Sequence, residues 1–497
     1  MSQPQKQPNI LLIMSDQHHK GIMGCAGHPL VQTPNLDALA GRATRFQNAI
    51  CNFPLCGPSR ASFMTGRHPH ETEVWGNNEE FRSDMPTYAH AFGAAGYETV
   101  LSGRMHFVGA DQRHGFERRV IGDCPASGYI AAGWQLGDVL GMLRDTPGMS
   151  RSGLTKSGAG RSGYLAYDEA VTDAAVQYLR ERSAADEARP MMLTVGYAMP
   201  HCPFVADPAD YALYADSVAE PTATEADLAH QHPLIQDQRA KFGSAPLPEP
   251  AVRKRVTAAY YGMVTHLDRQ VGRVLQALAD AGMAEDTIVV YTSDHGEQLG
   301  EHGCWWKSTF YEGSVGVPLL VARPGAAASV SPANVGLMDI GPTLLDLAGL
   351  PPLPGATGRS FRASLDGHDA DWDDTVFAEN VGKQPEFGPW RMIKRGHWKY
   401  NYYHGSEPEL FDLSTDPTED HNLAGDPAHA ALEAQLRAAV LDGWDPDSIA
   451  VRQSLRRREA SLLGRWQKEK QPAESDAPWF GDSPPENYLV DSTETAS

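Results

Sequence analysis

Cys56 begins the segment whose residue types and spacing point most directly to chemistry. The run Cys56–Arg67 (CGPSRASFMTGR) has a proline near the first turn of a short helical stretch and a glycine near its end. This pattern places Cys56 at or just before a helix N-terminus, where free backbone N–H groups and the helix dipole favour an anion. A thiol there has a lowered pKa, so a cysteine nucleophile is one interpretation. A buried cysteine ahead of an ordinary helix is the other.

Two polar pairs follow apolar runs at distant points of the chain. Asp16-Gln17 comes after residues 10–14, and Asp294-His295 comes after residues 287–293. Carboxylate and amide oxygens with one imidazole nitrogen form a ligand set that a divalent cation accepts. Taken singly, the first pair could be a turn and the second an ordinary loop. Their joint occurrence at two strand ends indicates one cation site.

Short apolar runs alternate with amphipathic stretches from Asn9 to about Gly349. We expect strands at 10–14, 98–102, 191–197, 287–293 and 317–322, and helices at 35–42, 166–182, 257–281 and 340–349. This alternation is typical of an α/β sheet covered on both faces. Reactive side chains follow each of the first four strands: Asp16 and Gln17, Arg104 and His106, His201, then Asp294 and His295. Ligands in such sheets bind beyond the carboxyl ends of the strands, so we expect these side chains to converge.

The sequence changes in character beyond about residue 370. Phe377, 390–394, 398–403 and 410–411 are expected to be antiparallel strands, with a turn at 395–397 and a helix at about 427–441. We therefore divide the chain into an α/β domain over 1–370, an α+β subdomain over 371–465 and a polar tail over 466–497.

Composition and charge limit the class of partner and the compartment. Lys and Arg number 42 against 63 Asp and Glu, a net charge of -21, which disfavours nucleic acid and anionic membranes. The apolar run at 10–14 is too short for a signal peptide or a membrane span. Six scattered cysteines without a CxxC pair indicate neither a disulfide scaffold nor structural zinc. We expect a cytoplasmic protein.

The segment Cys56–Arg67 resembles the sulfatase signature, which is Cys-x-Pro-Ser-Arg followed by a hydrophobic-Thr-Gly-Arg ending. The resemblance extends over almost the whole chain, through 9–17, 33–37, 102–109, 292–297, 409–413, Asp416-Pro417 and Asn422-Leu423. Within this family of the alkaline-phosphatase superfamily, the chain looks most like the bacterial choline-sulfatase and phosphonate monoester hydrolase branches. The resemblance implies a large mixed, mainly parallel sheet sandwiched by helices, with a smaller C-terminal α+β subdomain.

The resemblance also implies two cofactors. A formylglycine-generating enzyme would oxidise Cys56 to formylglycine (3-oxoalanine), and one divalent metal ion would be bound beside it. The implied ligands are Asp16, Gln17, the modified Cys56, Asp294 and His295. Many sulfatases have Asp-Asp and Asp-Asn where this chain has Asp16-Gln17 and Asp294-His295, but the two branches named above share the present pattern. We expect calcium first, with manganese or magnesium as alternatives, the nitrogen ligand favouring manganese.

The resemblance to this family implies a role for each of these positions. The hydrated formylglycine at position 56, deprotonated with help from Asp294, would attack sulfur while Arg60, Lys307 and the metal neutralise charge. His201 and Lys307 would protonate the departing alcohol, and His106 would then take the proton that lets sulfate leave. Asn77 and Arg104 match positions that contact the substrate, although a polar turn residue is an equal interpretation of Asn77.

The alcohol pocket is harder to predict, because the resemblance to choline sulfatase thins after Ile121. Aromatic rings for a quaternary ammonium could come from Trp75, Tyr129 and Trp134, each of which is more often a packed residue. We therefore expect a sulfatase acting on a small alkyl or aryl sulfate. The alternatives are a phosphonate monoester or phosphodiester hydrolase, a choline sulfatase proper and an inactive binding homologue. A homodimer or homotetramer is expected from the resemblance.

Overall fold

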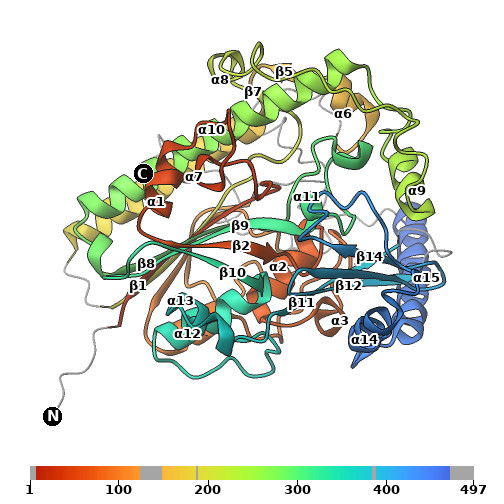
Figure 1. The fold of residues 1–497 in the computed structure, drawn as a ribbon. Helices are drawn as coiled ribbons and strands as arrows, with labels where there is room; N and C mark the ends of the chain where they lie inside the picture. Colours follow the sequence, from red (N-terminus) through yellow and green to blue (C-terminus); the bar gives the residue numbers. More distant parts are fainter. Residues whose placement is uncertain (1–6, 124–147, 186–188, 383–387, 471–497) are drawn as a thin grey trace.

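An eight-stranded sheet forms the centre of the protein in a computed structural model that describes residues 7–123, 148–185, 189–382 and 388–470 (Figure 1). The strand order is β10-β2-β9-β8-β1-β6-β3-β4. These strands are β1 (Asn9–Ser15), β2 (Thr44–Ile50), β3 (Glu98–Gly103), β4 (Arg118–Ile121), β6 (Met191–Gly196), β8 (Thr287–Ser293), β9 (Gly316–Ala322) and β10 (Ser329–Gly336). β9 runs antiparallel to its two neighbours and the other pairs are parallel, so the predicted mixed, mainly parallel sheet is confirmed.

Both faces of this sheet are buried, which explains why its central strands are apolar throughout. In β1, Ile10, Leu12 and Met14 belong to one core and Leu11 and Ile13 to the other, because successive side chains point to opposite faces. One core includes residues of α2 (Cys56–Thr65), α4 (Tyr88–Ala94) and α12 (Ile340–Leu347). The other includes residues of α1 (Pro34–Ala40), α7 (Gly163–Ala184) and α10 (Pro250–Asp280). The helices therefore lie in layers on either side of the sheet.

The five strands and four helices predicted for this region are present, with ends shifted by a few residues. The prediction lacks β2, β4 and β10, which lie at or next to the edges of the sheet. The sequences of β2 (TRFQNAI) and β10 (SVSPANVG) contain too many polar and breaker residues to form an apolar run. The prediction also lacks the two-stranded sheet of β5 (Gly158–Ala159) and β7 (Val205–Ala206), as well as shorter helices such as α9 (Pro233–Lys241).

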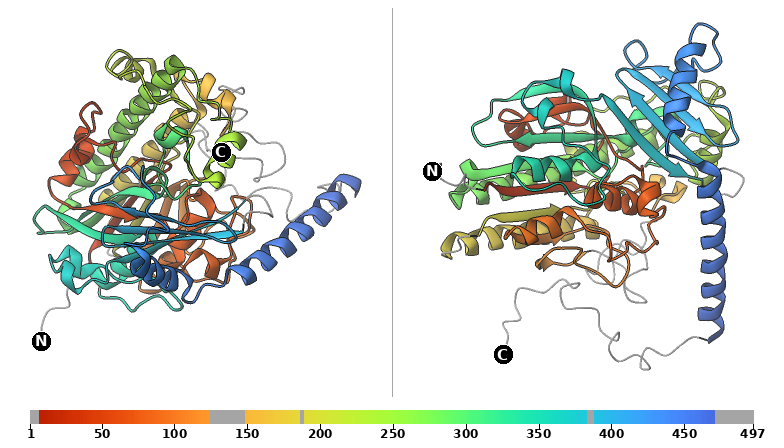
Figure 2. Two further views of the ribbon diagram at one scale, coloured as in Figure 1. Left: turned by 45° about the vertical axis from the view of Figure 1, so that its right-hand side comes forward. Right: turned by 90° about the horizontal axis from the view of Figure 1, so that it is seen from below.

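A second sheet, antiparallel and four-stranded, follows in the chain as predicted. It contains β11 (Thr375–Val381), β12 (Pro389–Arg395), β13 (Trp398–Tyr403) and β14 (Glu409–Asp412). The predicted helix at 427–441 corresponds to α14 (Ala430–Leu441). The long α15 (Pro446–Lys470) was not predicted, and it includes the first residues of the segment expected to be a polar tail. It projects from the body as a single rod (Figure 2).

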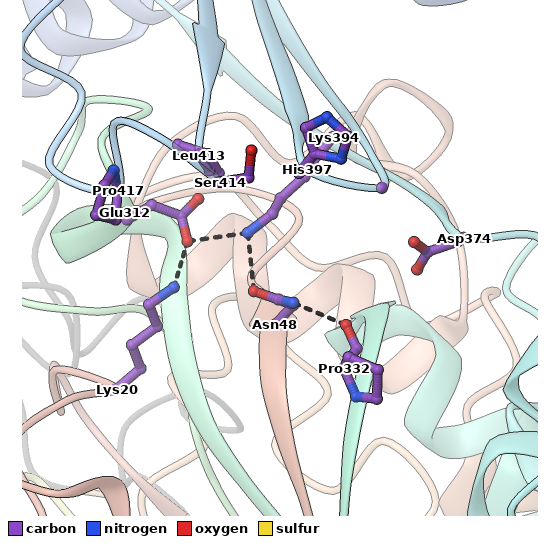
Figure 3. A pocket seen from close by; sticks show the side chains of 11 residues that line it. Lys20, Asn48, Glu312, Pro332, Asp374, Lys394, His397, Leu413, Ser414 and Pro417 are labelled. Atoms are coloured by element: carbon purple, nitrogen blue, oxygen red, sulfur yellow. Dashed lines mark hydrogen bonds and ion pairs between the residues drawn. The ribbon is translucent and has the colours of Figure 1, made fainter.

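A buried cluster of charged side chains attaches the second sheet to the first. The Glu312 carboxylate, in α11 (Glu312–Val315), pairs with Lys20, with Lys394 of β12 at 3.1 Å and with Lys399 of β13 at 3.0 Å. Burial raises the pKa of Glu312, but the three ammonium groups lower it well below its usual value. Beside this cluster lies a pocket of about 440 Å³ between the two sheets, where Lys20 and Lys394 pair with Glu312 and Asn48 accepts a hydrogen bond from Lys394 (Figure 3).

Candidate active site

Cys56 is the first residue of α2, as the sequence predicts. The helix ends at Gly66, which has the left-handed φ of 64° that favours glycine. The Oδ1 of Asn77 accepts a hydrogen bond of 2.9 Å from the N–H of Gly57 in the first turn. A side chain at Gly57 would approach the Asn77 backbone to 3.2 Å, so the glycine permits this close contact. Asn77 thus caps the helix that presents Cys56.

The register of the parallel strands brings the two acidic residues together. Ser15 of β1 is paired with Ser293 of β8, so Asp16 and Asp294 leave the sheet side by side. Ligand atoms of Asp16, Cys56, Asp294 and His295 all lie within 4.8 Å of one another, and all four residues are fully buried. The Sγ of Cys56 is 3.2 Å from Nε2 of His295 and 3.6 Å from Oδ1 of Asp16.

Arg60, one turn into α2, orients both carboxylates. Its Nη2 donates to Oδ2 of Asp16 at 3.1 Å and its Nε donates to Oδ2 of Asp294 at 2.9 Å. The Oδ1 atoms of both aspartates are thereby left directed at the cluster around Cys56 and His295. Two carboxylate oxygens and one imidazole nitrogen, buried and turned toward one point, suit a divalent cation. These contacts favour a positioning role for Arg60 rather than the direct substrate contact implied by the resemblance.

Gln17 is held at the same site from two sides. Its Nε2 donates to Oε2 of Glu297 at 2.5 Å, and its Oε1 accepts a hydrogen bond of 2.9 Å from Nζ of Lys307. Glu297 therefore fixes which end of the amide faces Lys307. Nζ of Lys307 also lies 3.2 Å from Sγ of Cys56. The other oxygen of Glu297 accepts the N–H groups of Leu299 and Trp306, so one carboxylate connects Gln17 to the loop that presents Lys307.

Arg104 and His106 follow β3 and reach the cluster from its other side. Nε of Arg104 donates to Oδ2 of Asp16 at 2.8 Å, and its Nη2 is 3.0 Å from Nδ1 of His106. Since a guanidinium only donates, Nδ1 of His106 accepts, and its Nε2–H donates to the carbonyl of Asn77 at 3.1 Å. Oδ2 of Asp123 accepts the backbone N–H groups of Met105 and His106. This carboxylate fixes the loop that carries both side chains.

His201 follows β6, and the rings of His201 and His106 help to lower the pKa of the Cys56 thiol. Burial lowers the pKa of His201, but Cys202 and Asp16 raise it to about 10, against the opposing effect of Lys307. The imidazole is therefore protonated at neutral pH. Burial raises the pKa of the Cys56 thiol, whereas Lys307 and His295 lower it well below its usual value. The position thus stabilises a negative charge.

The backbone carries strain at the same place. Gln17, His106, Trp306 and Ser308 have φ values of 69°, 57°, 67° and 80°, in the left-handed region that side chains other than glycine rarely adopt. Each such residue costs about 1–3 kcal/mol, and they cluster where function requires a particular geometry. Lys307 lies between two of them.

The catalytic, substrate-contacting and metal-binding residues predicted from the sequence lie in this cluster or contact a member of it. Sequence reasoning missed Glu297 and Asp123 as parts of the site. Glu297 belongs to the stretch 292–297 that carries the resemblance, which was the available signal. Trp75 is only 4% exposed and packs under the guanidinium of Arg456 at 4.8 Å, so it does not offer a face to a ligand. Tyr129 and Trp134 lie outside the described residues.

The sequence model of the family described as Sulfatase matches residues 8–350. The chain belongs to the sulfatase family. A second model, described as N-sulphoglucosamine sulphohydrolase, C-terminal, matches residues 300–443 of this sulfatase. The sulfuric ester hydrolase predicted from the sequence is therefore confirmed at the level of the family.

Two curated relatives and one solved structure resemble this sulfatase over most of their length. A choline-sulfatase of Rhizobium meliloti is 36% identical over 479 residues, covering 91% of this chain and 90% of the relative. An arylsulfatase of Clostridium perfringens is 30% identical over 455 residues, covering 84% of this chain and 90% of the relative. The structure of a phosphonate monoester hydrolase of Agrobacterium radiobacter has a TM-score of 0.73 at 25% identity, covering 88% of this chain and 95% of the hydrolase chain. No helix in the described ranges is long and apolar enough to cross a membrane.

Proposed function

We propose that this sulfatase hydrolyses a small alkyl or aryl sulfate ester, using a nucleophile derived from Cys56 beside one divalent ion. The observation that carries the proposal is the position of Cys56, at the N-terminus of α2 and within 4.8 Å of the Asp16, Asp294 and His295 ligand atoms. We further propose that a formylglycine-generating enzyme oxidises Cys56, and that the hydrated aldehyde supplies the attacking oxygen.

The side chains around Cys56 have complementary tasks in this reaction. Asp16, Gln17, Asp294 and His295 would hold the ion, which would act as a Lewis acid on the sulfuryl group. Asp294 accepts the proton of the attacking hydroxyl, while Lys307 neutralises charge that develops on the sulfuryl oxygens. Protonated His201, with Lys307, donates a proton to the departing alcohol. His106 would accept the proton whose removal releases sulfate, at its Nδ1 and in place of the hydrogen bond from Arg104.

Mass spectrometry of the Cys56 peptide tests the nucleophile. In a host that contains the maturation enzyme, we expect the peptide to be lighter by the difference between a thiol and an aldehyde. An active protein with only unmodified Cys56 would contradict the proposal and favour a thiolate nucleophile, which the lowered pKa of Cys56 would also suit.

The second candidate is a phosphonate monoester or phosphodiester hydrolase that uses the same site. The structural similarity to the Agrobacterium radiobacter enzyme favours it. Relative kcat/KM values on an aryl sulfate and the matching aryl phosphonate monoester distinguish the two. We expect the sulfate to be the better substrate. Choline sulfate belongs in the same series, because the Rhizobium meliloti relative is a choline-sulfatase.

A further inference from the structure

The stretch of chain between β6 and His201 is held from one side by α7. Three residues of this helix are spaced four apart, on one face: Tyr164, Asp168 and Thr172. Oγ1 of Thr172 lies 3.0 Å from the hydroxyl oxygen of Tyr197. The ring of Tyr164 lies edge to face with the ring of His201, with 5.9 Å between the centroids. The helix therefore contacts both ends of this stretch, and Asp168 lies between the two contacts.

The buried carboxyl group of Asp168 binds two successive backbone N–H groups. Its Oδ1 accepts the N–H of Ala198 at 2.8 Å, and its Oδ2 accepts the N–H of Met199 at 2.8 Å. The residue is 0% exposed. Burying a carboxyl group costs free energy unless hydrogen bonds satisfy it, and here both oxygens serve the backbone. Asp168 therefore fixes the orientation of two adjacent peptide groups.

The two residues held by Asp168 also contact the active site directly. The carbonyl oxygen of Met199 accepts the N–H of Asp16 at 3.1 Å, and the carbonyl oxygen of Ala198 accepts the N–H of His201 at 3.1 Å. One carboxyl group of α7 is thus connected, through two peptide units, to a proposed metal ligand and to the proposed acid. A displacement of these peptide units would move His201 with them.

The orientation of the His201 ring depends on the same stretch of backbone. Its Nδ1 lies 2.6 Å from the carbonyl oxygen of Cys202. Because a carbonyl only accepts, Nδ1 carries a hydrogen and donates it in this bond. Nε2 is therefore the nitrogen that can give a proton to a substrate, and the backbone on either side of His201 determines its position. A displacement of about 1 Å at such a group can cost about 10²-fold in rate.

We propose that Asp168 is a positioning residue for departure of the alcohol, because it holds the backbone that aims Nε2 of His201 at the leaving oxygen. The proposal rests on the proposed function, in which the bond from sulfur to this oxygen breaks, the electron pair stays on the oxygen, and the proton of Nε2 joins it. Asp123 has the corresponding place in the loop of His106, where it also accepts two successive N–H groups. Each proton-transfer step thus depends on its own aspartate.

A series of esters with different alcohols tests the proposal on the full-length, mature enzyme. Protonation helps most when the alcohol is a poor leaving group, so 4-nitrophenyl sulfate needs it least and an alkyl sulfate needs it most. The test variant is Asp168→Asn, whose amide nitrogen cannot accept an N–H group. Asp173→Asn, at a side chain of the same helix that is 68% exposed, is the matched control. Asp123→Asn is the comparison for the other loop.

Asp168→Asn should lower kcat/KM by about tenfold or less for 4-nitrophenyl sulfate and by about 10²–10³-fold for an alkyl sulfate. Asp173→Asn should match the wild type, and Asp123→Asn should lose activity by one factor for every alcohol. Added to His201→Ala, Asp168→Asn should cause little further loss, because the effects of residues that act through one another do not add. An equal loss for all alcohols in Asp168→Asn, or an additive loss in the double variant, would overturn the proposal.

Circular dichroism checks that the variants are folded. If Asp168→Asn is not, Asp168→Glu keeps both acceptors but moves them by one methylene group, and it should show the same dependence on the alcohol. A wild type that hydrolyses phosphonate monoesters but not sulfates would overturn the proposed function alone, because the same series of phosphonate esters still tests Asp168. A wild type that hydrolyses neither class would overturn both.

Discussion

The Nζ of Lys307 lies 3.2 Å from the Sγ of Cys56. The same ammonium donates to Oε1 of Gln17 at 2.9 Å, so it contacts both the proposed nucleophile position and a proposed metal ligand. Burial lowers the pKa of Lys307, but Cys56 and Asp16 raise it above its usual value. The amine is therefore charged at neutral pH and can stabilise negative charge at this point.

Cys56→Ala should lower kcat by about 10⁶-fold or to the uncatalysed background, because it removes the attacking group. Steady-state assays with an aryl sulfate measure this. Cys25→Ala is the control, since Cys25 is half-buried in a different part of the protein. Full activity in Cys56→Ala would rule out the mechanism.

His106→Ala should slow release of sulfate by about 10²–10⁴-fold while leaving the first step less affected. Rapid-mixing experiments should therefore give a burst of alcohol that exceeds the sulfate released, with sulfate retained on the protein by mass. His28→Ala, at a half-buried histidine beside Tyr261, should behave as the wild type. Equal loss of alcohol and sulfate formation, without a burst, would place His106 in the first step instead.

Glu297→Gln should weaken metal binding by about 10–100-fold, the usual effect of removing a partner that orients a ligand. The new amide must keep its oxygen for the N–H groups of Leu299 and Trp306, so its NH₂ would face the NH₂ of Gln17 and disturb the orientation of that side chain. Equilibrium dialysis with elemental analysis measures the affinity without an assay of activity. Glu301→Gln, on the same loop but half-exposed, is the matched control. An unchanged metal affinity would show that Gln17 does not need Glu297 to keep its orientation.

Stability should fall in mild acid partly because of His114. This buried ring stacks on Phe81 at 4.0 Å, and burial lowers its pKa to about 4. Below about pH 6.5 the unfolded chain binds a proton that the folded chain does not bind, so stability decreases as pH falls and the loss is complete near the folded pKa. By about pH 5 this residue should have lowered the free energy of unfolding by roughly 2 kcal/mol.

Denaturant titrations between neutral pH and mild acid measure this contribution as a difference between variants. Asparagine tolerates the left-handed φ of 42° at this position. The free energy of unfolding of His114→Asn should therefore fall less steeply with decreasing pH than that of the wild type. His421→Asn, at a side chain 82% exposed, should follow the wild type. Parallel curves for all three proteins would contradict the assignment to His114.

The sequence predicted the elements whose burial pattern is strong. The apolar runs of β1 and β8 were recognisable because both sheet faces are covered, and their polar end residues marked the site. β2 and β10 were not predicted because their sequences contain no apolar run. They form strands because of their hydrogen-bonded positions in the sheet. Glu297 and Asp123 were not predicted as site residues because their roles depend on contacts with Gln17 and with the N–H of His106. These contacts form only in the folded protein. α15 was not predicted because its few apolar residues lie among many charged and polar ones.

The charged cluster at Glu312 has a consequence for how this enzyme can be divided. Lys20 lies three residues after Gln17 and Glu312 five residues after Lys307, while Lys394 and Lys399 belong to the second sheet. A fragment ending near residue 370 would remove two of the three cations that pair with Glu312, and removing partners of a buried charge costs several kcal/mol. The loss would fall on the loops that carry the catalytic groups. The two sheets should therefore fold as one unit, and a fragment that kept every proposed catalytic residue but lacked the second sheet should be less stable than the full chain.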